Sequence, residues 1–461
     1  MSEIVCISPI DGREVARRKT ASPSEIDAAL AGARKAQRDW ASVPLEERVA
    51  TVLRGIEALG AMNEDIVAEL ALQMGRPIRY GGEFRGVEER ARHMASIAEA
   101  SLAPIVPEAK AGFRRMIKRE PLGVVLVVAP WNYPYLTAIN AIVPALIAGN
   151  AVILKHAAQT ILVGERFQTA FDRAGLPKGL FTHLVLTHAD TARILSAGAV
   201  DHANFTGSVA GGKAIERAAA GTFTSLGLEL GGKDPAYVRP DARFDHSVEN
   251  LVDGAFFNSG QCCCGIERIY VHEALFDRFV DAYVDLTRRY ILGNPLEQET
   301  TLGPMAHLRF AELVRRQTNE ALSKGARPHI DAKTFPANAS GTPYLAPQVL
   351  THVDHTMSVM VEESFGPVVG IMKVKSDEEA VSLMNDSPYG LTASIWSSDT
   401  DAAEAIGDRV ETGTVFMNRC DYLDPALAWT GVKDTGRGAS LSEIGYATLT
   451  RPKSFHLRHA L

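Results

Sequence analysis

The chain has 461 residues, too many for one ordinary hydrophobic core, which predicts two or three domains. Its apolar content of 46%, charged content of 22% and net charge of −7 are typical of a folded protein and argue against a basic nucleic-acid-binding surface. The most apolar run, residues 122–129, is far shorter than the ~20 residues of a spanning helix, so no membrane partner is expected.

The first residues contain no basic segment followed by an apolar one, so the sequence predicts no secretory signal. The five cysteines are odd in number and three of them are adjacent, which argues against a disulfide framework. We therefore expect a protein of the reducing cytoplasm.

The first clear helix is predicted over residues 22–40. Ser22 can cap it, Pro23 suits its first turn, and Glu25 completes a capping box. The charged stretch 79–92 is also predicted to be helical, with its charges on a solvated face.

From Val124 onward, strands alternate with helices. We predict strands at 124–130, 151–156, 180–186 and 202–207, and helices at 136–149, 160–174, 190–198 and from Ser208. This order favours a doubly wound parallel sheet, which binds ligands at the carboxyl ends of its strands. A second α/β pattern follows residue 235, and the tail at 450–458 is predicted to be an extended strand.

The adjacent cysteines Cys262, Cys263 and Cys264 have several interpretations. A zinc site is weakly supported, because adjacent side chains of an extended chain point to opposite faces and no second cluster with metal-ligand spacing follows. Two of them are interpreted as small buried apolar residues. The presence of a third adjacent cysteine calls for a chemical explanation.

Six motifs supply that reason, because together they resemble the aldehyde dehydrogenase superfamily in its own order. They are "APWNYP" (129–134), "FTGSVAGG" (205–212), "LELGGKDP" (228–235), "GQCCCGIER" (260–268), "EESFGPV" (362–368) and "GVKDTGRG" (431–438). The resemblance covers essentially the whole chain. It implies an α/β fold with a Rossmann-type parallel-sheet cofactor domain, an α/β catalytic domain and a small β oligomerisation arm.

The resemblance also implies how the chain is divided. Residues 1–111 and 122–228 would form the NAD(P)-binding domain, and 229–418 the catalytic domain. Residues 112–121 and 447–461 would be oligomerisation strands, and 419–446 would return to the cofactor domain and the substrate entrance. A homodimer or homotetramer is expected.

The family motif Gly-Gln-x-Cys selects Cys263 as the nucleophile, with Cys262 and Cys264 as packing neighbours that point away from it. The resemblance implies a thiohemiacetal at Cys263, hydride loss to nicotinamide, and hydrolysis of the resulting thioester. A thiolate is the strongest side-chain nucleophile near neutral pH. Glu229 matches the general base that activates water, and Asn132 the amide that stabilises the oxyanion.

The remaining site residues are also carried over from the family motifs. Those implied to bind NAD or NADP are Pro130, Trp131, Lys155, Gly207, Ser208, Gly212, Leu230, Glu363 and Phe365. No metal ligand is implied. Positions that map to the substrate tunnel are Tyr135, Phe257, Arg419, Tyr422 and Trp429, and among them Arg419 can anchor the carboxylate of a semialdehyde.

Three positions depart from the family pattern. Ala158 stands where many NAD-preferring members have a glutamate, which predicts that NADP is tolerated. Ser440 replaces a glutamate that helps proton removal in some members, and Thr435 replaces a serine.

Two alternatives to hydrolytic aldehyde oxidation stay open at this stage. A coenzyme-A-acylating enzyme is disfavoured by Glu229, because that branch usually lacks the water-activating base. A non-catalytic binding protein on this fold is disfavoured because Cys263, Glu229, Asn132, Lys155 and Glu363 are all present. The sequence names no particular aldehyde.

Overall fold

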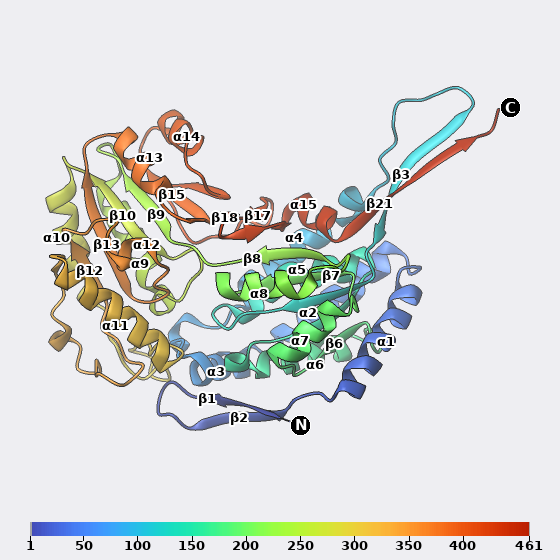
Figure 1. The fold of residues 1–461 in the computed structure, drawn as a ribbon, viewed down its shortest axis with the longest axis horizontal. Coiled ribbons are helices and arrows are strands. Elements are labelled where there is room, and N and C mark those ends of the chain that lie inside the picture. The colour runs from blue at the N-terminus through green and yellow to red at the C-terminus, as the bar shows by residue number, and fades with distance from the viewer. Residues whose placement is uncertain (1, 461) are drawn as a thin grey trace.

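The computed structural model describes residues 2–460, which fold into two lobes, each built on its own β-sheet (Figure 1). The first sheet has the strands, in spatial order, β19 (Gly436–Arg437), β8 (Ser225–Glu229), β7 (His202–Thr206), β4 (Val124–Val128), β5 (Ala151–Lys155) and β6 (Phe181–His183). Strands β8 to β6 are parallel, whereas β19 pairs with β8 in antiparallel fashion. The predicted parallel sheet is thus confirmed.

Helices pack around this first sheet. They are α1 (Pro23–Trp40), α2 (Leu45–Gly60), α3 (Asn63–Met74), α4 (Phe84–Leu102), α5 (Pro134–Ala148), α6 (Leu162–Arg173), α7 (His188–Ser196) and α8 (Val209–Ala219), with 3-10 turns η1 (Ile78–Tyr80) and η2 (Ala158–Thr160). Strands β4 and β5 are buried along their whole length. This explains why they are continuous apolar runs without polar alternation.

The second sheet has the order β11 (Arg327–Pro328), β12 (Gln348–Thr351), β13 (Val368–Val374), β10 (Ile266–His272), β9 (Asp234–Val238), β15 (Thr392–Trp396) and β16 (Thr414–Met417). Its helices are α9 (Phe244–Phe256), α10 (Phe276–Thr287), α11 (Leu308–Ser323), α12 (Ser358–Val361), α13 (Asp377–Asn385) and α14 (Thr400–Gly407), with 3-10 turns η3 (Phe257–Gly260) and η4 (Ala332–Thr334). The two lobes have separate hydrophobic cores.

Short strand pairs complete the chain. They are β1 (Glu3–Ile7) with β2 (Glu14–Lys19), β14 (Tyr389–Gly390) with β18 (Val432–Lys433), and β17 (Trp429–Thr430) with β20 (Ala439–Ser440). Strand β3 (Phe113–Pro121) pairs along its full length with β21 (Thr450–Arg458), and this two-stranded arm projects from the body of the molecule beyond α15 (Ser442–Thr448) (Figure 1). No helix among residues 2–460 is long and apolar enough to cross a membrane.

Local predictions hold best where capping residues mark the ends of a helix. The Ser22–Glu25 capping box at the start of α1 is present, with both reciprocal hydrogen bonds. Two boundaries were wrong. The charged stretch 79–92 splits into η1 and α4, and the strand expected at 180–186 is only three residues long. That strand, β6, lies at the sheet edge and pairs only with β5, so nothing extends its ladder.

Candidate active site

The three adjacent cysteines lie in a tight turn between η3 and β10. The amide of Gly265 donates to the carbonyl of Cys262 at 3.2 Å, which closes the turn. The Sγ atoms of Cys262 and Cys264 are 3.5 Å apart, and all three Sγ atoms lie within 4.8 Å of one another. The expectation that Cys262 and Cys264 point away from Cys263 was therefore wrong, because side chains alternate only along an extended chain.

The three thiols influence one another's ionisation. Hydrogen bonds from the thiols of Cys263 and Cys264 lower the pKa of Cys262. The same interaction raises the pKa of Cys263, because its thiol donates to Cys262. Hydrogen bonding within the cluster thus favours ionisation of the Cys262 thiol over that of Cys263.

Glu229 is the last residue of β8, at the carboxyl end of the parallel sheet. Its carboxylate accepts hydrogen bonds from the Ser440 hydroxyl at 2.5 Å and the Thr206 hydroxyl at 3.1 Å. Burial raises the pKa of Glu229 above its ordinary value, and these two hydroxyls partly oppose that rise. A carboxyl with a raised pKa in a cleft is suited to general acid–base chemistry.

Asn132 lies on the loop between β4 and α5, and its side-chain amide donates to the carbonyl of Gln261 at 3.3 Å. Its own carbonyl accepts from Arg76 at 2.5 Å and from the Asn258 side chain at 3.2 Å. Asn258 also donates to the Gln261 carbonyl at 3.2 Å, so it ties the Asn132 loop to the cysteine turn. Asn258 has a left-handed φ of 53°, an uncommon conformation that such buried contacts can sustain.

A buried ion pair, Arg76 with Glu83, stabilises the loop that carries Asn132. Arg76 contacts Glu83 at 2.6 Å, and the other Glu83 oxygen accepts from the amides of Tyr135 and Leu136 at 3.0 and 2.7 Å. The carboxylate therefore caps the start of α5. The sequence analysis missed Arg76 and Glu83, since no local motif marks residues that act only through distant partners, whereas Asn258 begins the segment "NSGQ" that it expected to orient Cys263.

Cys263 and Glu229 line one cavity of about 150 Å³ between the two lobes. Its other walls include Tyr133, Leu136, Phe257, Asp421, Leu423 and Trp429. Phe257 and Trp429, which the sequence analysis mapped to the substrate tunnel, thus line this cavity.

Three residues assigned to the substrate tunnel lie outside this cavity. Tyr135 is buried and packs its ring 5.3 Å from that of Phe167, because it lies on the helix face that meets the core. Arg419 stacks over the ring of Tyr422 at 3.6 Å, and the Tyr422 hydroxyl donates to Glu89 at 2.5 Å. The adjacent aromatic residue Tyr133 lines the cavity instead.

The guanidinium in the cavity wall belongs to Arg90 of α4, which the sequence analysis did not single out. Its Nη1 donates to the Leu136 carbonyl at 2.9 Å and to Asn140 at 3.1 Å. Among residues 2–460, no carboxylate forms an ion pair with it. Burial lowers its pKa, as expected of a cation taken out of water.

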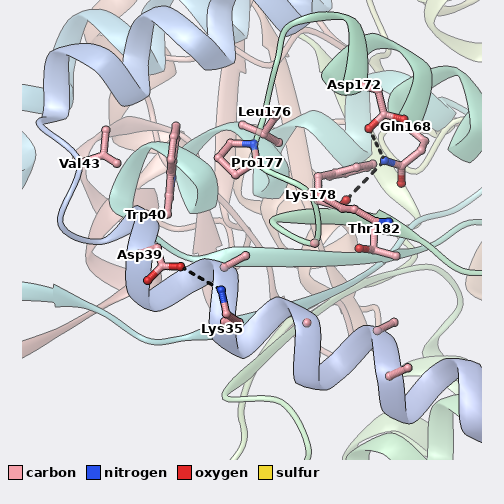
Figure 2. A pocket seen from close by; sticks show the side chains of 16 residues that line it. Lys35, Asp39, Trp40, Val43, Gln168, Asp172, Leu176, Pro177, Lys178 and Thr182 are labelled. Carbon is pink, nitrogen blue, oxygen red and sulfur yellow. Dashed lines mark hydrogen bonds and ion pairs between the residues drawn. The ribbon is translucent and has the colours of Figure 1, made fainter.

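A larger cavity, of about 900 Å³, lies beside α1 and α6 (Figure 2). Its walls carry the Lys35–Asp39 ion pair at 3.6 Å and the bond from Gln168 to Asp172 at 2.9 Å. It shares no residue with the cysteine cavity. Size therefore does not identify the candidate active site here, whereas the convergence of a thiol and a buried carboxyl group does.

The residues expected at the cofactor lie around the carboxyl ends of β5, β7 and β8. Lys155 ends β5, is buried, and its pKa is lowered by burial. Ser208 caps α8 and accepts from the amide of Gly211 at 3.2 Å. No ion pair in the described part of the chain involves Lys155. A buried ammonium without an ion pair, at the same edge of the sheet as the N-terminus of α8, fits a dinucleotide that carries hydroxyls and phosphates.

Gly212 and Gly207 have packing roles in this region. A Cβ on Gly212 would lie 2.5 Å from the Leu230 side chain, so glycine lets α8 approach the segment after β8. A Cβ on Gly207 would lie 2.7 Å from the ring of Phe205. Both glycines thus bring the start of α8 close to the sheet.

Glu363 and Phe365 lie on the loop before β13. The Glu363 carboxylate accepts from the amide of Gly232 at 3.1 Å, and burial together with Glu267 raises its pKa to about 8. Phe365 has a left-handed φ of 49°, and its ring lies 5.5 Å from that of Trp131.

Glu267 of β10 holds this loop. One of its oxygens accepts from the amide of Phe365 and the other from the amide of Ser364, both at 2.8 Å. Lys233 pairs with the same carboxylate and is fully buried. The sequence analysis missed Glu267 and Lys233, although both lie inside motifs it quoted.

Pro130 and Trp131 follow β4, on the same side of the sheet. The Trp131 ring stacks on Phe310 at 5.1 Å. Leu230, next to Glu229, is buried and belongs to the wall of the cysteine cavity. These residues surround the space between the cysteine turn and the carboxyl ends of the strands.

A parallel-sheet lobe and a second α/β lobe, with a cavity lined by cysteines and a buried carboxyl group, are the arrangement of an α/β enzyme. Residues 1–455 match the model of the aldehyde dehydrogenase family. The chain belongs to this family. It is an NAD(P)-dependent oxidoreductase that acts on an aldehyde group.

Similar proteins are known from several bacteria. An aldehyde dehydrogenase of Paenarthrobacter nicotinovorans is 33% identical over 96% of this chain and 97% of its own. A succinate-semialdehyde dehydrogenase (NADP+) of Deinococcus radiodurans is 31% identical over 97% of this chain and 93% of its own. The solved structure of succinic semialdehyde dehydrogenase from Streptococcus pyogenes in complex with NADP+ superimposes with a TM-score of 0.93, at 27% identity, over 99% of this chain and 100% of its own. The fold class expected from the sequence is confirmed.

Proposed function

We propose that Cys263 is the nucleophile, Glu229 the general base and Asn132 the oxyanion donor in the oxidation of an aldehyde to a carboxylic acid. The single observation that carries this proposal is that Cys263, on the turn before β10, and Glu229, at the end of β8, line one cavity. The Cys263 sulfur adds to the carbonyl carbon, and the oxyanion is met by the Asn132 amide. One such donor contributes about 3 kcal/mol in acyl-transfer sites.

A nicotinamide cofactor, when bound, would supply the acceptor for the hydride of the tetrahedral carbon. Lys155 and Ser208 would hold the adenosine ribose and the pyrophosphate, and Glu363 the nicotinamide ribose. Phe365 and Trp131, whose rings meet edge to face, would support the ring. Pro130, Gly207, Gly212 and Leu230 would shape the same site. Glu229 then takes a proton from water, which attacks the Cys263 thioester and releases the acid.

The cofactor preference rests on Ala158. This residue begins η2, directly after β5, and is exposed. Its methyl group leaves no carboxylate near Lys155 to repel a 2′-phosphate. We therefore propose that NADP is used as well as NAD, and the NADP-specific name of the Deinococcus radiodurans relative agrees with this proposal.

The substrate class rests on Arg90. An unpaired guanidinium in the cavity wall can bind an anionic group on the tail of the aldehyde, as a semialdehyde carries. Asp421, on the same wall, opposes an anion, but burial and the charge of Cys262 raise its pKa to about 7 and so reduce its charge at neutral pH. Two relatives named above are semialdehyde dehydrogenases. Arg90 replaces Arg419 as the proposed anchor.

A pair of variants tests Arg90. In Arg90→Met the KM for an aldehyde with a terminal carboxylate should rise at least about tenfold, which matches the loss of one charge-assisted bond of ~1.5–3 kcal/mol. The KM for an uncharged aldehyde of the same length should change little, and Arg90→Lys should restore part of the difference. Equal effects on both aldehydes would show that Arg90 only supports the fold.

The reaction itself is tested with a panel of aldehydes, each with NAD or NADP, by the absorbance of the reduced cofactor. Wild type should turn over without coenzyme A, and Cys263→Ala should be inactive, whereas Cys6→Ala, remote from the cavity, should match wild type. A requirement for coenzyme A would instead support an acylating enzyme. An undiminished rate in Cys263→Ala would exclude the proposed nucleophile.

We also propose the division of the chain into domains and an oligomer. The boundaries expected from the sequence assign 1–111 and 122–228 to the cofactor domain, 229–418 to the catalytic domain, and 419–446 to a returning segment. An isolated two-stranded ribbon such as β3–β21 is marginally stable in water. We therefore infer that this arm pairs with a second copy in a homodimer or homotetramer. Sedimentation equilibrium tests this, and a monomer at micromolar concentration would contradict it.

The cellular compartment is also a proposal. Cys6, Cys262, Cys263, Cys264 and Cys420 are all free thiols in the structure, including the close pair Cys262 and Cys264. Free thiols this close together persist best in a reducing compartment, so we propose the cytoplasm. Fractionation of the native host, with the chain found in an oxidising compartment, would contradict this assignment.

A further inference from the structure

The mechanism uses one of the three cysteines in the turn and leaves Cys262 and Cys264 without a role. All three Sγ atoms nevertheless lie within 4.8 Å of one another, and those of Cys262 and Cys264 are 3.5 Å apart. Cys6 and Cys420 are buried singly elsewhere, against the carbonyls of Gln159 and Asn250. The turn is therefore the one place in the described chain where thiols gather.

This arrangement is close to the geometry of a thiolate metal site. Zinc binds thiolate sulfur at about 2.3 Å in a tetrahedron, which places two ligand sulfurs ~3.8 Å apart. The Cys262–Cys264 separation of 3.5 Å is within a few tenths of an ångström of that value. The third sulfur, that of Cys263, lies within 4.8 Å of both.

The residues around the three sulfurs leave room for a fourth ligand of the ion. The three cysteines share the wall of the catalytic cavity, so a water can take the fourth position. Asp421 lies on the same wall and offers carboxyl oxygens near the sulfurs. Soft thiolates select ions such as zinc, cadmium and copper(I) over magnesium and calcium.

We propose that Cys262, Cys263 and Cys264 together form a three-thiolate site for a soft metal ion such as Zn²⁺, whose binding removes Cys263 from catalysis. The bound ion is coordinated by the Cys263 sulfur, so that sulfur can no longer add to the aldehyde. The ion also blocks the space that the aldehyde must enter. Enzyme activity then depends on the free concentration of soft metal ions, and a chelator restores it. Cys262 and Cys264 are the residues that distinguish this site from a single reactive thiol.

Cadmium serves as the probe, because its bonds to thiolate sulfur absorb in the ultraviolet. The full-length reduced protein, without aldehyde or dinucleotide, is titrated with Cd²⁺. Wild type should show one saturating absorbance change per chain, with an amplitude that corresponds to three sulfur ligands. Mg²⁺ in excess should leave the signal unchanged. The absorbance change does not depend on catalysis. It therefore tests metal binding separately from the proposed role of Cys263 as the nucleophile.

Single substitutions decide which thiols bind. Cys264→Ala and Cys262→Ala should each lower the amplitude by about one third and weaken cadmium affinity at least tenfold, whereas Cys6→Ala and Cys420→Ala should bind as wild type does. Cys264→Ser serves in place of an alanine variant that fails to fold, as judged by circular dichroism. In parallel assays, inhibition by Zn²⁺ should weaken by the same factor. Wild-type affinity and amplitude in both the Cys262 and Cys264 variants would overturn the proposal.

Discussion

The hydroxyl of Ser440 donates a hydrogen bond of 2.5 Å to the carboxylate of Glu229, across 211 residues of sequence. Ser440 ends β20, in the segment that returns to the first lobe after the second lobe is complete. Where the family often has a glutamate, this chain therefore has a neutral donor on the proposed base. That donor stabilises the charged form of Glu229 and opposes the effect of burial.

Ser440→Ala should therefore raise the pKa of Glu229 further. A hydrogen bond from a neutral donor favours the charged form of a carboxylate, so its loss disfavours that form. The acidic limb of the kcat–pH profile, where Glu229 must lose its proton, should therefore move to higher pH. Ser440→Thr keeps the hydroxyl and should keep the wild-type limb. If the acidic limb of Ser440→Ala is not shifted, Ser440 does not influence the ionisation of the proposed base.

Ala158→Glu should convert the cofactor preference. The new carboxylate would lie after Lys155 and repel a 2′-phosphate, so the KM for NADP should rise at least about tenfold, or about 1.4 kcal/mol. The KM for NAD should change little or fall. Ala158→Gln, which has nearly the same size without the charge, is the matched control and should change the KM for NADP much less. Equal effects of both variants would point to size and not charge.

Glu363 should make the cofactor-free protein less stable as pH rises. Its carboxyl ionises near 4.5 in the unfolded chain and near 8 in the folded one, so the folded state keeps a proton that the unfolded state has lost. The free energy of unfolding that this group contributes therefore falls between those two pH values. In Glu363→Gln the decline in melting temperature over this window should be smaller than in wild type. An equal decline in both proteins would remove Glu363 as its cause.

The Arg76–Glu83 pair should be important for stability. Both side chains are buried, and loss of one partner leaves the other as an uncompensated charge. Arg76→Met should lower the free energy of unfolding by ~3–5 kcal/mol in urea titrations. The exposed Arg85, which has no ion pair among the described residues, is the matched control, and Arg85→Met should change stability little. A small effect of Arg76→Met would mean that Glu83 is stabilised by the α5 amides alone.

The sequence was most informative where contiguous motifs carry the chemistry. Cys263 and Glu229 lie in separate motifs and line one cavity, and Asn132 contacts the carbonyl of Gln261, two residues before Cys263. Asn132 and Glu229 lie at the carboxyl ends of β4 and β8, so the order of strands and helices was enough to expect these two at one edge of the sheet. Cys263 precedes β10 of the other sheet, and the family resemblance alone placed it with them.

The sequence was least informative where contacts depend on side-chain direction or long range. Tyr133 and not Tyr135 lines the cavity, because the start of α5 turns the second ring toward Phe167. Arg90 has no motif around it and reaches the cavity from a helix that precedes every quoted motif. The three thiols converge because a hydrogen-bonded turn replaces the extended chain that was assumed.

The identity of the reacting sulfur is tested most directly by trapping the acyl enzyme. Glu229→Gln, which should form the thioester but hydrolyse it slowly, is mixed with an aldehyde and NADP, quenched in acid and digested for mass spectrometry. The account predicts one equivalent of reduced cofactor and a mass increase on Cys263 equal to the aldehyde less two hydrogens. The same increase on Cys262 or Cys264, or one equivalent of reduced cofactor with no acylated cysteine, would contradict it.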